Sequence, residues 1–82
     1  MLELKDTIDL MQSDDYKDRF KAEYYQLKIR IDKLAAMLGK WDRGELNFTP
    51  TCPRGLYDTQ IKGMVDYFNV LSVRAEMEGI EL

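Results

Sequence analysis

The chain has 82 residues, of which 33% are charged and 45% hydrophobic, with a formal net charge of −3; this composition is typical of a folded globular protein and excludes a disordered one. No stretch approaches the roughly 18 consecutive apolar residues of a membrane span, and the charged start of the chain is unlike a signal peptide. The single Cys52 has no partner for a disulfide within the chain, which suits a reducing compartment. We therefore expect a single domain over residues 1–82 in the cytoplasm.

Two helices are predicted in the first half of the chain. A short helix covers about residues 3–12, and a long one covers residues 14–43. Ser13 is the expected N-cap of the long helix, because its hydroxyl can accept a hydrogen bond from a free backbone N–H. Gly44 follows directly after this helix and is a typical stop signal.

A loop and a third helix are predicted in the second half. Residues 45–52 form the loop, and its apolar side chains are expected to fold back over Trp41. The third helix covers about residues 53–78, with Thr51 as its N-cap. Gly79 ends it, and the next residue is placed to fold back on the last turn.

The two long helices each carry a stripe of large apolar residues spaced three and four apart, which predicts antiparallel packing of one helix on the other. The stripe of the second helix is Tyr16, Phe20, Tyr24, Leu27, Ile31, Leu34, Leu38 and Trp41, and that of the third is Tyr57, Ile61, Met64, Phe68, Leu71 and Ala75. The predicted fold is all-α: a short N-terminal helix and then a long two-helix hairpin.

A weaker second stripe on each long helix is not needed for the hairpin seam. A two-helix hairpin has a thin core, so these second faces are expected to join copies of the chain into a helical bundle. The sequence thus predicts a homo-oligomer. Its expected interface residues are Tyr25, Tyr67, Val70 and Met77.

Charge is unevenly distributed along the chain. Residues 16–43 hold 8 basic and 4 acidic side chains, a balance of +4, whereas the rest of the chain holds 4 basic and 11 acidic ones, a balance of −7. Such a chain lacks the extended positive surface that binds nucleic acid. One basic helix can still hold a small anion or an acidic segment of another copy.

The residue types argue against an enzyme. The chain has no His, one Cys and five scattered Gly, so it offers no imidazole base, no zinc site and no glycine-rich phosphate loop. Asp14, Asp15 and Asp18 cluster at the start of the second helix, where negative charge compensates the helix dipole. We expect no catalytic residue, no metal and no cofactor.

Two groups of residues are candidates for binding an anionic ligand. Thr49, Thr51 and Arg54 meet in a proline-containing turn before a helix, where backbone N–H groups favour phosphate. The simpler interpretation is a capped turn with an exposed arginine. The second group is an aromatic ring flanked by two cations at helical spacing, an arrangement that can stack a base beside phosphate; here the alternative is a partner contact or core packing. It consists of Lys21, Tyr25 and Lys28.

Two segments resemble a known family. The runs 13–30 (Ser-Asp-Asp-Tyr-Lys-Asp-Arg-Phe-Lys-Ala-Glu-Tyr-Tyr-Gln-Leu-Lys-Ile-Arg) and 48–53 (Phe-Thr-Pro-Thr-Cys-Pro) resemble small proteins of phages and prophages of Firmicutes and gut bacteria, related to a protein of crAss-like phages. The C-terminal residues 74–76 and 79–82 fit the same pattern. This resemblance implies a phage accessory protein.

The predicted architecture is also similar to the hairpin domain of phage sponge proteins that counter the CBASS and Thoeris defences. Those proteins oligomerise and sequester cyclic nucleotide signals between subunits, although the His-rich element of the members that counter CBASS has no counterpart in this chain. The similarity implies sequestration of a small cyclic nucleotide immune signal. The alternative is a phage protein that binds and inhibits a host protein, such as a nuclease or an RNA-guided defence effector, through its acidic surface.

Overall fold

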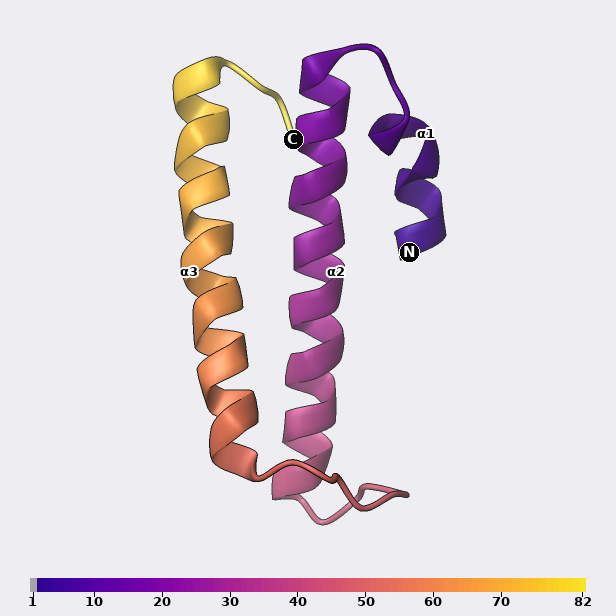
Figure 1. Cartoon of the computed structure of the whole chain (residues 1–82), viewed down its shortest axis with the longest axis vertical. Helices are drawn as coiled ribbons and strands as arrows, with labels where there is room; N and C mark the ends of the chain where they lie inside the picture. Colours follow the sequence, from indigo (N-terminus) through magenta and orange to yellow (C-terminus); the bar gives the residue numbers. More distant parts are fainter. Residues whose placement is uncertain (1) are drawn as a thin grey trace.

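A computed structural model describes residues 2–82. The elements in chain order are the 3-10 turn η1 (Leu4–Thr7) and the helices α1 (Ile8–Met11), α2 (Tyr16–Asp42) and α3 (Arg54–Glu78). Figure 1 shows α2 and α3 side by side and antiparallel, with α1 on the opposite side of α2 from α3. The predicted all-α class, with a short N-terminal helix before a long hairpin, is confirmed.

The apolar stripes of α2 and α3 meet along the hairpin, as their spacing predicts. Leu71 is completely buried, and the rings of Tyr24 and Phe68 lie 4.8 Å apart between centroids. The apolar area removed from water is the main stabilisation of this seam. The buried cluster comprises Phe20, Leu27, Leu71, Ala75 and Ile80.

Both predicted N-caps are wrong. The N-cap of α2 is Asp15, whose carboxylate accepts from the backbone N–H of Lys17 at 2.9 Å. Ser13 stands two residues earlier, accepts from the N–H of Asp15 and donates to Asp18. The N-cap of α3 is Pro53 and has no side-chain cap bond, so Thr51 lies outside the helix.

The C-terminus of α3 ends as the sequence predicts. Gly79 has a φ of 68°, a left-handed conformation that glycine adopts without steric cost. This reversal lets the N–H of Ile80 donate to the carbonyl of Ala75 at 2.8 Å. Ile80 is thereby buried against the seam.

The N-terminal segment covers part of the second stripe of α2. Thr7 is completely buried, donates to the carbonyl of Leu4 at 2.7 Å and accepts from the amide of Gln26 at 2.9 Å. Ala22 and Ile29 are buried as well, and both lie outside the seam that α2 forms with α3. Therefore the second face of α2 near its N-terminus packs within the chain, and only its remaining part is open.

A polar cluster joins the two long helices at the open end of the hairpin. The Tyr16 hydroxyl donates to Glu78 at 2.6 Å and accepts from Arg74 at 3.0 Å. The hydrogen bond with Glu78 raises the pKa of Tyr16, and the same bond lowers the pKa of Glu78. Arg74 also bonds Glu78 at 3.2 Å and lies over the ring of Phe20. This cluster fixes the register of α3 on α2.

Tyr16→Phe is expected to remove a pH-dependent part of the stability. The pKa of Glu78 is lower in the folded chain than in the unfolded chain. Glu78 therefore adds to the free energy of unfolding above its ordinary pKa, and this stabilisation is lost as the pH falls through its pKa in the folded chain. The pKa of Tyr16 is higher in the folded chain than in the unfolded chain. Tyr16 therefore adds to the free energy of unfolding below its ordinary pKa of about 10, and this stabilisation is lost as the pH rises through its pKa in the folded chain. The thermal midpoint of the variant should be lower than that of the parent at pH 7, and this difference should narrow as the pH falls below 4.5, the ordinary pKa of a glutamate. A gap that stays constant across this range would contradict the assignment.

Candidate functional site

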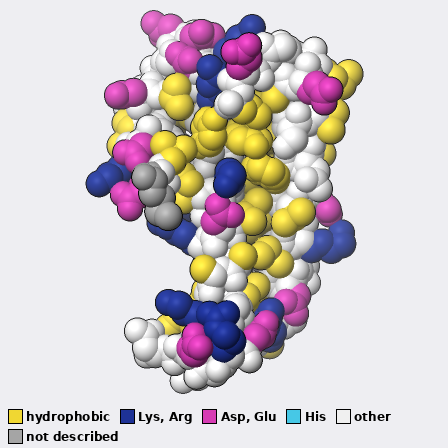
Figure 2. Space-filling model, turned by 180° about the vertical axis from the view of Figure 1, so that it is seen from behind, with side chains coloured by type: hydrophobic (Ala, Val, Ile, Leu, Met, Phe, Trp, Pro, Cys, Tyr) yellow, Lys and Arg dark blue, Asp and Glu magenta, His cyan; other side chains and the backbone are white. Residues whose placement is uncertain are grey.

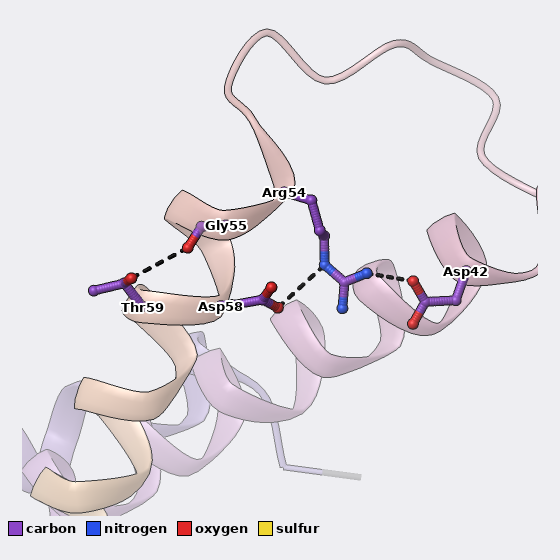
Figure 3. Close-up of polar contacts among 5 residues, drawn as sticks. All are labelled: Asp42, Arg54, Gly55, Asp58 and Thr59. Carbon is purple, nitrogen blue, oxygen red and sulfur yellow. Dashed lines mark hydrogen bonds and ion pairs between the residues drawn. The ribbon is translucent and has the colours of Figure 1, made fainter.

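The side chain of Arg54 is already engaged within the chain. Its guanidinium bonds Asp42 at the end of α2, and its Nε lies 3.3 Å from a carboxylate oxygen of Asp58 (Figure 3). The hydrogen bond with Asp42 is the main reason that the pKa of Arg54 is raised. The guanidinium also lies 5.7 Å from the centre of the Trp41 ring. Arg54 thus closes the loop end of the hairpin, and its charge is balanced by two carboxylates.

The two threonines predicted to assist Arg54 are exposed on the loop. Within the part of the chain that the structure describes, no hydrogen bond links Thr49 or Thr51 to Arg54. The pairing with Asp58 could be expected from the sequence, because residues four apart on a helix are neighbours. The pairing with Asp42 could not, because it depends on how residues 43–53 bring the ends of α2 and α3 together.

Two of the three residues of the second predicted group, Lys21, Tyr25 and Lys28, line a hollow on the surface of α2. Tyr25 and Lys28 line a hollow of about 300 Å³ together with Leu2 of the N-terminal segment, whereas Lys21 is not part of its lining. The ammonium of Lys28 pairs with Asp32 at 3.2 Å, so its charge is partly balanced. The ring of Tyr25 packs edge-on against Tyr24. The structure thus places Tyr25 and Lys28 together on an open surface.

This hollow is one of three that adjoin along α2, and we call the whole surface the α2 trough. The middle hollow, of about 250 Å³, shares Ile29 and Asp32 with the first, and it shares Lys33 and Ala36 with the third, of about 340 Å³. Loop residues 45–48 form the far wall of the third hollow. Figure 2 shows the outline of the molecule hollowed above the projecting loop, with Lys and Arg side chains gathered at that end.

The third hollow contains functional candidates that the sequence analysis missed. Lys33 and Lys40 line it from α2, and Leu46 and Phe48 line it from the loop. These loop residues were expected to cover Trp41, but the aromatic and cationic contacts of the Trp41 ring come from α3, and Phe48 is 54% exposed. The only sequence signal for this hollow is the position of the two lysines on the side of α2 away from the seam.

The outer face of α3 carries three of the four predicted interface residues. Tyr67, Val70 and Met77 are 43%, 55% and 82% exposed. Tyr25 does not share this face, because it lines a hollow with the N-terminal segment, and that segment and α3 flank α2 on opposite sides (Figure 1). Large apolar side chains exposed together mark a surface suited to a partner. On the outer side of α3 they are Leu56, Tyr67, Val70, Val73 and Met77.

Neither a membrane span nor a metal centre is found in the described structure. None of the helices within residues 2–82 is both long enough and apolar enough to cross a bilayer. The same residues contain no cluster of three or more His, Cys, Asp or Glu side chains arranged to hold a metal ion.

The comparisons with known proteins give one match. The family described as Sequestin matches residues 14–77, which span α2, the loop and nearly all of α3. No curated protein and no solved structure matches the chain. The family name suggests sequestration, that is, binding rather than catalysis, and it specifies no ligand. A match over most of the chain shows that this protein belongs to the Sequestin family.

Proposed function

We propose that this protein is a non-enzymatic phage accessory protein that sequesters a small cyclic nucleotide immune signal at an interface between copies of the chain. The observation that carries the proposal is membership of the Sequestin family over residues 14–77. The phage setting and the nucleotide come from the resemblance of residues 13–30 and 48–53 to small phage proteins and from the sponge-like hairpin.

The surface of the protein supports binding of an anionic ring. The α2 trough combines aromatic and aliphatic side chains with lysines, and such a combination suits a ligand that has both bases and phosphates. Tyr25 and Lys28 remain candidates for one wall of the ligand site, because they line the same hollow. Arg54, Thr49 and Thr51 are weaker candidates, since the charge of Arg54 is balanced within the chain.

The outer face of α3 supports assembly of copies. Tyr67, Val70 and Met77 recur at steps of three and seven residues, which places them on one side of the helix. A second copy would remove this apolar face from water. This burial would add to the small apolar area that a two-helix hairpin buries by itself. Assembly also brings two troughs into one particle.

A thermal-shift panel tests the proposed function. The purified protein is heated with cyclic dinucleotides, cyclic trinucleotides and cyclic forms of ADP-ribose. A ligand at about 100 times its Kd adds about 2.7 kcal/mol of stability, and each kcal/mol raises the midpoint of a domain of this size by about 4–8 °C. We therefore expect a rise of about 10–20 °C with at least one of these compounds. No shift with any of them would reject the proposal.

The second candidate is an inhibitor that binds a host protein. The acidic balance of −7 outside residues 16–43 and the exposed apolar face of α3 favour it. A nuclease, whose substrate is polyanionic, is the kind of target that this surface would engage. Recovery of one stoichiometric host protein with the tagged chain, together with a flat thermal-shift panel, would favour this function over sequestration.

A further inference from the structure

The hollow between α2 and the loop is the part of the α2 trough that is best equipped to bind a charged ligand. We call it the loop hollow. Its volume of about 340 Å³ is at the lower end of the ~300–1,000 Å³ range of small-molecule sites. Four residues of one side of α2 form one wall, and four consecutive loop residues form the other. The lining consists of Lys33, Ala36, Met37, Lys40, Glu45, Leu46, Asn47 and Phe48.

The loop hollow carries positive charge that is not balanced locally. Lys33 and Lys40 are seven residues apart, about 10.5 Å along the axis at ~1.5 Å per residue, and they therefore lie on the same side of α2. Neither forms an ion pair with any side chain in residues 2–82. Glu45 is the one acidic residue of the lining, and it pairs with Arg43 at 3.1 Å. Two ammonium groups are thus free to bind an anion.

The same hollow presents an aromatic surface beside these cations. Phe48 is 54% exposed, although an aromatic ring gains free energy when it leaves water. Met37 and Leu46 are half-buried and extend the apolar surface around it. A flat apolar surface next to two cations matches a planar base that carries phosphate. Asn47 adds an amide that can donate to or accept from the edge of such a base.

We infer that the loop hollow binds the ligand through a phosphate ester that carries a planar base, with Lys33 and Lys40 on the phosphate groups and Phe48 stacked on the base. This inference rests on the proposed function and names the residues that each copy of the chain would contribute to the ligand site. Tyr25 could join this site only from another copy of the chain, because within one chain Tyr25 and Lys40 are about 22 Å apart along α2 at ~1.5 Å per residue. Arg54 is excluded from it by its two aspartate partners.

Backbone NMR on the ¹⁵N-labelled protein locates the site directly. The protein is titrated with AMP, which has one phosphate and one base, and then with cyclic di-AMP, with adenosine and inorganic phosphate as partial probes. We expect the amide shifts of residues 33–40 and 45–48 to move, with AMP acting at lower concentration than either partial probe. Movement confined to residues near Tyr25 or Arg54 would overturn the inference and leave sequestration standing. No movement with AMP or cyclic di-AMP, together with a flat thermal-shift panel, would reject both.

Charge-matched variants test the roles of the side chains. Because a hydrogen bond to a charged group is worth about 1.5–3 kcal/mol, Lys33→Gln with Lys40→Gln should weaken the binding of cyclic di-AMP at least about tenfold. Phe48→Leu keeps an apolar side chain but removes the ring. It should weaken the binding of cyclic di-AMP by about three- to tenfold and leave the concentration of inorganic phosphate at half-saturation unchanged.

The matched control is Arg30→Gln with Lys62→Gln, which removes the same charge from exposed positions outside the hollow. Circular dichroism confirms that each variant keeps its helices. If the control and the lysine variant weaken binding equally, the effect is one of net charge, and the loop hollow is not the site.

Discussion

Leu71→Ala is expected to lower the free energy of unfolding by about 2–5 kcal/mol, since the loss includes both the transfer free energy of the removed atoms and the cavity left behind. Leu71 is completely buried in the seam between α2 and α3, and Phe20 and Ala75 of the same cluster are both 2% exposed. A chain of this length has a total stability of only about 4–12 kcal/mol. The variant should therefore lose a large share of its stability, measured as a lower midpoint in urea with an unchanged slope.

Leu82→Ala is the matched control for this prediction. It makes the same chemical change outside α3, at a residue that is 45% exposed. Substitutions at such exposed positions are usually within about 0.5 kcal/mol of the parent. Equal losses for the two variants would mean that the packing of α3 on α2 is not the main source of stability.

Tyr67→Arg is expected to dissociate the proposed assembly while the helices remain formed. Tyr67 lies on the outer face of α3 and is not part of the buried cluster or of the residues packed against it, so the seam of one chain should stay intact. At the centre of an apolar interface, an arginine without a partner is a buried charge that costs several kcal/mol. Light scattering at micromolar concentration should give a multiple of 9.7 kDa for the parent and 9.7 kDa for the variant.

Glu76→Arg introduces the same side chain on the other side of α3. Position 76 follows position 67 by nine residues, about two and a half turns, and so faces roughly the opposite way. This control should keep the mass of the parent. A parent mass of 9.7 kDa would reject assembly altogether, and an unchanged mass for Tyr67→Arg would place the interface on another surface.

The hairpin could be predicted because its information is local and periodic. Spacings of three and four residues placed Phe20, Leu71 and Ala75 on the seam, and all three are buried. The N-cap of α2, predicted as Ser13, was wrong for a physical reason. The run Ser-Asp-Asp offers three oxygen-bearing side chains in succession, and the structure uses Asp15 as the cap while Ser13 bonds the N–H of that residue.

The candidate site could be predicted only in part, because a binding surface depends on where loops go. Tyr25 and Lys28 are three residues apart on one helix, so helical geometry predicts that they are neighbours, and they line one hollow. The position of Phe48 opposite Lys33 and Lys40 depends on the path of the loop, which no spacing rule specifies. The pairing of Arg54 with Asp42 depends on the same path.

Recovery of an unchanged ligand tests the central claim, sequestration, most directly. The protein is incubated with the cyclic nucleotide that gives the largest thermal shift, freed of unbound ligand by gel filtration, and denatured, and the released compound is then identified by mass spectrometry. A sequestering protein returns the intact cyclic nucleotide in a fixed ratio to the chain, and it removes that compound from solution before denaturation. Release of a linearised or otherwise altered product, or retention of none of the compound, would contradict the account.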